Sequence, residues 1–123
     1  MEYYRTYHSI VLTSHDFFIQ IDVFSLGNIF YILLMDEWPF KGVQSNRAQE
    51  KIAAGERSRL YRDIYESTDP IIVALKTAMM MCHEQDPTVR ATAREVEAYL
   101  KERLEIIDPG RLATWPKPVI RSE

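Results

Sequence analysis

Cysteine and glycine are scarce in this sequence. Its 123 residues include one cysteine, Cys82, and four glycines, Gly27, Gly42, Gly55 and Gly110. A single cysteine excludes a disulfide within the chain, which suits a reducing compartment, so we expect an intracellular, cytoplasmic protein in which Cys82 is a buried structural thiol. The glycines are too widely spaced for the G-x-G-x-x-G loop that cradles nucleotide phosphates.

An excess of positive charge and a long apolar run are also absent. The 15 basic and 18 acidic side chains give a net charge of −3, so no overall positive field attracts phosphate backbones, and we expect no nucleic-acid ligand. Residues 23–35 are mostly apolar, but a membrane-spanning helix needs about 20 such residues. We therefore expect no membrane span. The 46% of hydrophobic and 27% of charged residues are typical of one folded domain.

The most hydrophobic segment, "DVFSLGNIFYILLMDEWPF" at residues 22–40, predicts a helix from about residue 23 to residue 34 or 35. Its apolar side chains cover nearly every direction, so we expect this helix to be central and surrounded by protein. Asp22 is placed to cap its first turn, and Gly27 indicates close approach of another backbone. Pro39 prevents helical continuation, leaving Trp38 and Phe40 to fold back on the core.

The remaining segments predict an all-α fold with three further helices around the central one and irregular termini. Residues 1–20 have no clean periodicity and are expected to be irregular, with a short strand at 10–13. Ser45 is placed to cap a helix ending at Ala54, and residues 56–69 are expected to form a surface loop. Helices are predicted at 70–83, after Asp69, and from the "TARE" capping box to about 106. The predicted units are therefore 1–20, 21–106 and an extended tail at 107–123.

The order of these segments resembles the C-terminal half of the large lobe of a eukaryotic-type protein kinase domain. "IDVFSLGNIFYILL" is similar to the family's Asp-Val-Trp-Ser-Leu-Gly stretch, and "WPF", "KIAAGE" and "CHEQDPTVRATAREVEAYL" are similar to later landmarks in the same order. The resemblance covers about residues 21–104. The residues of this chain that match the family's motifs are Asp22, Gly27, Trp38, Pro39, Phe40, Asp86 and Arg90.

The resemblance implies roles for two of these charged residues. It implies that Asp22 anchors the backbone of a catalytic loop, whereas the residue type alone favours an ordinary helix cap. It implies that Arg90 pairs with the glutamate of an Ala-Pro-Glu motif, of which Glu2 is the candidate remnant. The alternative for Arg90 is a solvated surface charge.

The groups that perform phosphoryl transfer are missing from the sequence. A complete family member uses ATP and magnesium, with a glycine-rich loop, a strand lysine, a base aspartate and metal-binding residues. Ser14-His15-Asp16 lacks the arginine of His-Arg-Asp and is interpreted as a loop, and Asp108-Pro109-Gly110 follows the last helix and is interpreted as a helix stop. The histidines and the cysteine lack zinc-site spacing. We therefore assign no catalytic, cofactor-binding or metal-binding residue, and expect no cofactor for this chain.

Two functions fit these observations. In the first, the chain is part of a kinase that phosphorylates protein serine or threonine, begins inside a lobe, and is inactive by itself. In the second, it is a non-catalytic helical module that binds a protein partner through residues 43–68. In both, apolar surface that the rest of a lobe would cover is expected to favour self-association.

Overall fold

The computed structural model describes residues 14–114, 116–117 and 119. This part of the chain is all-α, as the sequence predicts, and contains no strand. Its helices are α2 (Ser14–Met35), α3 (Ser45–Ala53), α4 (Arg62–Tyr65), α5 (Pro70–Cys82) and α6 (Ala93–Ile107), followed by the 3-10 helix η1 (Leu112–Thr114). None of the described helices is long and apolar enough to cross a membrane.

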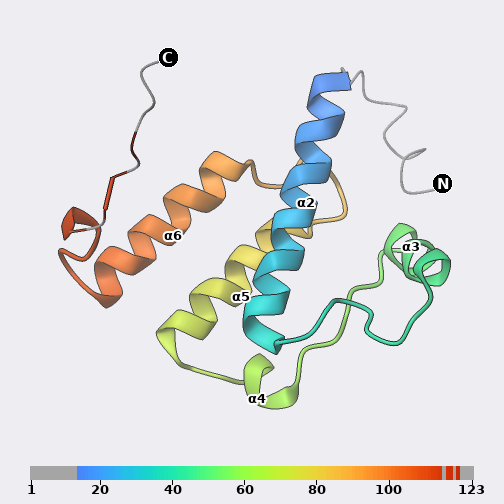
Figure 1. The fold of residues 1–123 in the computed structure, drawn as a ribbon, viewed down its shortest axis with the longest axis horizontal. Helices are drawn as coiled ribbons and strands as arrows, with labels where there is room; N and C mark the ends of the chain where they lie inside the picture. Colours follow the sequence, from blue (N-terminus) through green and yellow to red (C-terminus); the bar gives the residue numbers. More distant parts are fainter. Residues whose placement is uncertain (1–13, 115, 118, 120–123) are drawn as a thin grey trace.

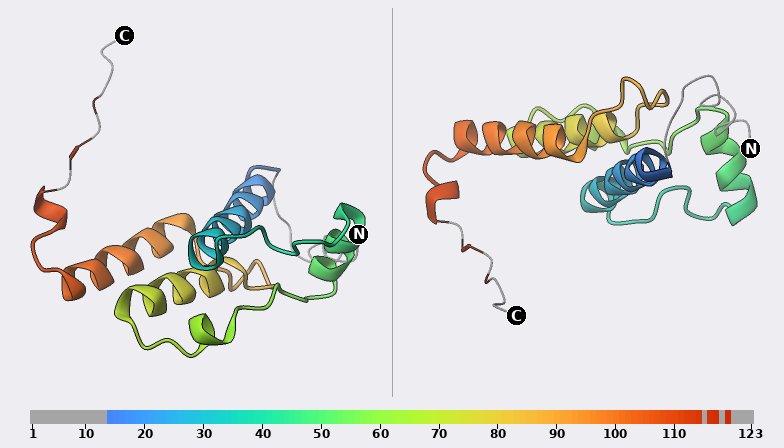
Figure 2. Two further views of the ribbon diagram at one scale, coloured as in Figure 1. Left: turned by 60° about the horizontal axis from the view of Figure 1, so that its bottom comes forward. Right: turned by 90° about the horizontal axis from the view of Figure 1, so that it is seen from above.

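Helix α5 links the other two long helices. It packs against α2 on one side and against α6 on the other, and Figure 2 shows α5 and α6 in one layer with α2 against it. In Figure 1, α3 lies away from this three-helix body, whereas α4 lies next to α5 and its Ile64 packs against the core. Neither short helix contains a fully buried residue. The α2, α5 and α6 helices therefore form the core, and residues 36–69 make an excursion from it.

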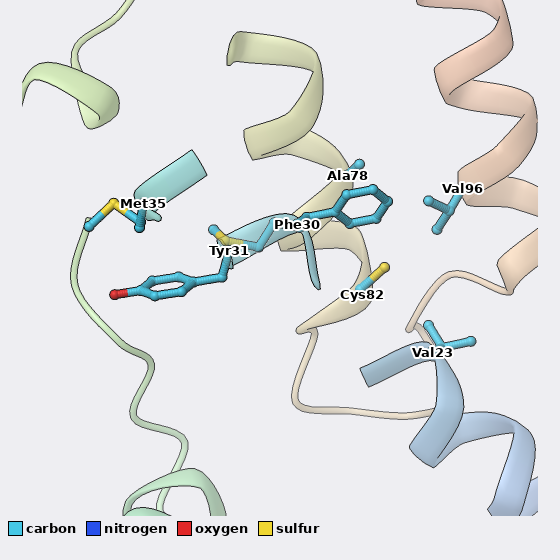
Figure 3. Packing of buried hydrophobic residues seen from close by; sticks show 8 residues of the cluster. Val23, Phe30, Tyr31, Met35, Ala78, Cys82 and Val96 are labelled. Carbon is cyan, nitrogen blue, oxygen red and sulfur yellow. The ribbon is translucent and has the colours of Figure 1, made fainter. Parts of the chain in front are cut away.

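The core contains side chains from all three long helices. Val23, Phe30, Tyr31 and Met35 of α2 meet Ala78, Met79 and Cys82 of α5 and Val96 of α6. The Phe30 ring lies next to Ala78 and points toward Val96 (Figure 3). Met79 is buried whereas its neighbour Met80 is 65% exposed, as expected of adjacent positions on a helix.

Helix α2 begins at Ser14, nine residues before the predicted start at about residue 23, so two sequence predictions are wrong. Residues 14–20 are helical rather than irregular, and Ser14-His15-Asp16 opens a helix rather than forming a loop. Asp22 lies inside the helix, exposed, and does not cap it. No proline or glycine interrupts residues 14–22, so the backbone hydrogen bonds continue through Asp22. The predicted strand at 10–13 lies outside the described residues.

The prediction that α2 is buried all round is also wrong for this chain. Val23 is 2% exposed, but Ile29 is 52% and Leu33 is 64% exposed. Asp22 and Ser25 are exposed as well, and their spacing places all four side chains on one side of the helix. We call Asp22, Ser25, Ile29 and Leu33 the outer face of α2. No described element covers this face because α5 and α6 lie on the opposite side.

The predicted helix ends agree with the structure where the signal is local. Asp69 caps α5, its Oδ1 accepting hydrogen bonds from the backbone N–H of Ile71 at 2.9 Å and of Ile72 at 3.3 Å. Thr92 and Glu95 form the predicted capping box of α6, with both distances 3.1 Å. These groups satisfy N–H donors that a helix start otherwise leaves unpaired.

Three local predictions fail. Gln44, not Ser45, is the N-cap of α3 and makes no side-chain cap bond. The helix starts at Ser45, one residue earlier than a Ser45 cap requires. The expected loop at 56–69 contains α4. The sequence predicts that this segment turns Leu60, Ile64 and Tyr65 inward; Leu60 and Ile64 do pack against the core, but Tyr65 is exposed. The expected extended tail begins with η1, whose first turn is closed by a backbone bond from Ala113 to Gly110.

Candidate functional site

Gly27 allows the end of α5 to approach α2 closely. A β-carbon at this position would lie 2.5 Å from Cδ2 of His83 and 2.8 Å from Cβ of Cys82, with no room for a methyl group. The sequence predicts such an approach, but side chains rather than backbone make it. It brings the "DVFSLG" stretch of α2 against the start of "HEQDPTVR", which follows α5.

His83 is held by α2 through its ring. One ring nitrogen, Nε2, is 3.0 Å from Oδ1 of Asn28, and the ring lies 4.6 Å from the Phe24 ring at an angle of 35°. Burial, and then the nearby Arg57 guanidinium, lower the pKa of His83 to about 4. The imidazole is therefore neutral at pH 7. Because Oδ1 of Asn28 can only accept, the tautomer that pairs with it carries its hydrogen on Nε2 and donates a hydrogen bond to Asn28.

Two arginines flank the Phe24 ring. The guanidinium carbons of Arg57 and Arg90 lie 5.0 Å and 5.5 Å from its centroid, within cation–π range. Arg57 donates to the backbone carbonyl of His83 through Nε at 3.1 Å and Nη2 at 2.8 Å, and to Oε1 of Gln85 at 2.6 Å. These bonds tie residue 57, in the excursion, to the end of α5.

Arg90 is buried, with 5% of its surface exposed, so its interpretation as a solvated surface charge is wrong. Its Nε donates to the carbonyl of Glu84 at 2.7 Å and its Nη2 to that of Gln85 at 3.3 Å. Glu2, the partner that the kinase resemblance implies, lies outside the described residues. Arg90 thus fastens the turn after α5 beneath Phe24.

Asp86 shapes the same turn. Its Oδ1 accepts from the backbone N–H of Thr88 at 2.9 Å and from the Thr88 hydroxyl at 2.6 Å, and its carbonyl accepts from the N–H of Arg90 at 2.9 Å. The Thr88 side-chain and backbone bonds hold the pKa of the Asp86 carboxyl below its usual value. Asp86 therefore sets the backbone that points Arg90 into the core.

The Trp38-Pro39-Phe40 corner follows α2 and forms part of a pocket. Phe40 is half-buried, and its N–H donates to Oγ of Ser58 at 2.6 Å. Trp38 is 74% exposed, so the prediction that it folds back on the core is wrong. Asp36 and Phe40 both have a φ of 56°, and the turn between these left-handed residues directs Trp38 outward.

The pocket has a volume of about 340 Å³ and lies between α2, the corner, residues 55–58 and the end of α5. We call it the α2–α5 pocket. Its walls include four apolar side chains, Phe24, Phe40, Met79 and Met80. Its polar lining comes from six residues: Asn28, Arg57, Ser58, His83, Glu84 and Gln85.

Some of the residues around His83 and Phe24 were not predicted from the sequence. Arg57 and Asn28 were not singled out, and His83 was considered only as a zinc ligand. Gly27 signalled a close neighbour, but nothing in the sequence identified it. Burial raises the pKa of Cys82 to about 11, as expected of a structural thiol. Among the described residues, no three His, Cys, Asp or Glu side chains are grouped to hold a metal ion.

Comparison with known proteins shows similarity to a serine/threonine-protein kinase. The chain is 33% identical over 86 residues to serine/threonine-protein kinase 33 from Mus musculus, and equally to that from Bos taurus. The match covers 70% of this chain but only 17% of each relative. No family profile and no solved structure matches. The similarity supports a kinase-related region in this chain.

Proposed function

We propose that this chain is the helical core of part of a serine/threonine-type kinase large lobe, following the activation segment, and transfers no phosphate by itself. One observation carries the proposal. The "DVFSLG" and "HEQDPTVR" stretches, which the kinase resemblance treats as landmarks of one lobe, meet in space. The His83–Asn28 contact joins residues that are 55 positions apart in the sequence. The fold, and not closeness in the sequence, therefore brings the two stretches together.

The outer face of α2 supports the same proposal. Asp22, Ile29 and Leu33 project from it without cover in the described part of the chain. Large exposed apolar side chains along a helix indicate a surface that another segment covers. In a larger lobe that segment would lie against Asp22, whose exposed carboxylate could then accept its backbone hydrogen bonds.

The residues present do not fit ATP or magnesium. Phosphoryl transfer requires charge neutralisation at the phosphates and a base that positions the acceptor hydroxyl. The sequence has no glycine-rich loop, no strand lysine of the kinase type and no His-Arg-Asp or Asp-Phe-Gly. We therefore derive no catalytic step for this chain.

Phosphate transfer tests the proposal. The purified chain would be incubated with γ-labelled ATP, Mg²⁺ and a mixture of protein substrates, before and after an added gel-filtration step. We expect any phosphate-transfer activity to come from a contaminating kinase, and therefore to elute in other gel-filtration fractions than the chain. Label transfer that co-elutes with the chain and disappears when it is heat-denatured would contradict the proposal.

A second candidate function is binding of a protein partner through residues 43–68. The supporting observation is that α3, which lies in this range, contains no buried residue and stands away from the three-helix body (Figure 1). Further along the range, Leu60 and Ile64 pack against the core and hold the segment to it. The segment is anchored by Arg57 and Ser58, and α3 offers an exposed surface that no core residue occupies.

A further inference from the structure

We propose that the α2–α5 pocket and the adjoining stretch 41–61 together bind an acidic peptide segment of a partner protein, with one large apolar side chain of the peptide in the pocket. This proposal names the chemistry of the partner for the second candidate function and rests on it. The peptide's carboxylates would contact exposed arginines of the stretch 41–61, which we call the basic stretch.

The pocket has the size and lining for one side chain. Its volume of about 340 Å³ is at the small end of ligand pockets, which start near about 300 Å³. Phe24, Phe40 and Met79 supply apolar contacts, and Met80 lines the pocket while being largely exposed. An incoming side chain can therefore reach the pocket from solvent, and the flexible methionines can adapt to its shape.

The basic stretch has a charge opposite to that of the whole chain. It carries five basic and two acidic residues, a net charge of +3 in a protein of net charge −3. The seven residues are Lys41, Arg47, Glu50, Lys51, Glu56, Arg57 and Arg59. It runs from just after the corner to just before α4, and Gly55, Arg57 and Ser58 within it form one wall of the pocket. Positive charge therefore borders the pocket directly.

Two arginines of this stretch are available for contacts. The side chains of Arg47 and Arg59 are exposed and form no ion pair with other described residues. By contrast, Lys41 and Lys51 lie near Glu37 and Glu56, at 3.6 Å and 3.7 Å.

Glu84 lines the pocket and carries negative charge at the end of α5. The acidic part of a bound peptide should therefore extend toward residues 57–59 and α3, away from Glu84. Charge complementarity of this kind steers encounter and selects partners.

An acidic peptide fits better than a nucleic acid, although both are anionic. Nucleic-acid affinity depends on many phosphate contacts, whereas the chain as a whole is acidic and offers only a short basic stretch. The apolar walls of the pocket suit one apolar side chain of a peptide, and the basic stretch beside it suits the carboxylates on either side of that side chain. Competition by an oligonucleotide is therefore an outcome of the test.

Fluorescence anisotropy with the full chain tests the proposal. The probe is a fluorescein-labelled peptide with one phenylalanine between flanking glutamates. The chain should bind it, and a probe with alanine for phenylalanine should bind about tenfold more weakly because the pocket stays unfilled. A probe with lysines for the glutamates should also bind at least about tenfold more weakly, since it opposes the basic stretch.

Exposed charge variants make the test specific. Arg47→Glu and Arg59→Glu should each weaken binding of the acidic probe by about fivefold or more. Arg94→Glu makes the same charge change at an exposed position of α6 and should change binding by less than about twofold. Met80→Glu should weaken binding by repelling the probe at the pocket, and its far-UV circular dichroism should match that of the unmodified chain.

Each remaining outcome contradicts the proposal. Equal binding of the alanine probe excludes the pocket, and equal binding of the lysine probe, or equal weakening by Arg94→Glu, excludes the basic stretch. Absence of binding to the acidic probe, or its displacement by a single-stranded oligonucleotide at lower concentration than by unlabelled peptide, excludes an acidic peptide as the ligand. None of these results bears on kinase relatedness, which phosphate transfer tests separately.

Discussion

The imidazole of His83 occupies the space where a side chain at Gly27 would begin. This contact fixes how closely α5 approaches α2, and the Phe24 ring and both flanking arginines are arranged around it. The junction between the two helices therefore depends on a missing methyl group and on an uncharged histidine. Both conditions can be tested separately.

Gly27→Ala should destabilise the protein. The added methyl group must displace the His83 ring and the Asn28 hydrogen bond. Overpacking costs about 1–3 kcal/mol and alanine returns about 1 kcal/mol of helix propensity, so a net loss of up to about 2 kcal/mol is expected in urea unfolding. Ser25→Ala, at an exposed position of the same helix, is the control and should change stability by less than about 0.5 kcal/mol. Equal effects would mean that the close contact is not present.

Acidification should weaken the fold through His83. The pKa of His83 is lowered to about 4 in the folded protein, from an ordinary value of 6.5. The unfolded chain therefore takes up this proton first, and stability falls as the pH drops from about 6.5 toward about 4. Two neighbouring arginines, Arg57 and Arg90, oppose protonation. From about pH 7 to about pH 5 the loss should be roughly 2 kcal/mol.

The variant His83→Gln isolates this effect. Glutamine does not titrate, so its free energy of unfolding should change much less between the same two pH values, whatever its absolute stability. Urea unfolding of both proteins at each pH measures the two slopes. Parallel slopes would show that another group causes the pH dependence.

Arg90→Lys should lower stability although it keeps the charge. A lysine ammonium cannot reproduce the guanidinium's bonds to the carbonyls of Glu84 and Gln85 or its position over Phe24. Leaving buried carbonyls underpaired costs about 1–3 kcal/mol. Arg94→Lys is the exposed control on α6 and should be neutral. Thermal unfolding that shifts equally for both variants would contradict this role of Arg90.

The uncovered face of α2 should make the protein self-associate and bind hydrophobic dyes. Ile29 and Leu33 are largely exposed, and a shallow apolar hollow lined by Leu26, Val96 and Leu100 lies between α2 and α6. Replacing both Ile29 and Leu33 by glutamine should reduce dye fluorescence and the associated fraction in analytical ultracentrifugation without lowering stability. Ile106→Gln, at an exposed position of α6, is the control. A monomer that binds no dye and unfolds sharply above about 65 °C would contradict the prediction.

The sequence predicts best where a structure depends on neighbouring residues. Asp69 and the Thr92–Glu95 pair cap their helices as expected because the atoms involved are a few residues apart. The predicted N-terminal limit of α2 was wrong because an aspartate such as Asp22 can cap a helix but is equally tolerated at an exposed position inside one. Local sequence does not distinguish these two environments.

The candidate site was harder to predict because it is assembled from distant residues. His83 meets Asn28 across 55 positions and Arg57 reaches His83 across 26. No spacing rule connects such residues, so only Gly27 and the family resemblance pointed to the region. The outward position of Trp38 likewise depends on the backbone of the turn around it.

We propose that α2 belongs to a kinase large lobe, and the transcript upstream of Met1 tests this proposal most directly. We predict that the reading frame continues upstream and encodes the His-Arg-Asp and Asp-Phe-Gly motifs. A stop codon in frame shortly before Met1, with neither motif encoded in the same transcript, would contradict the claim.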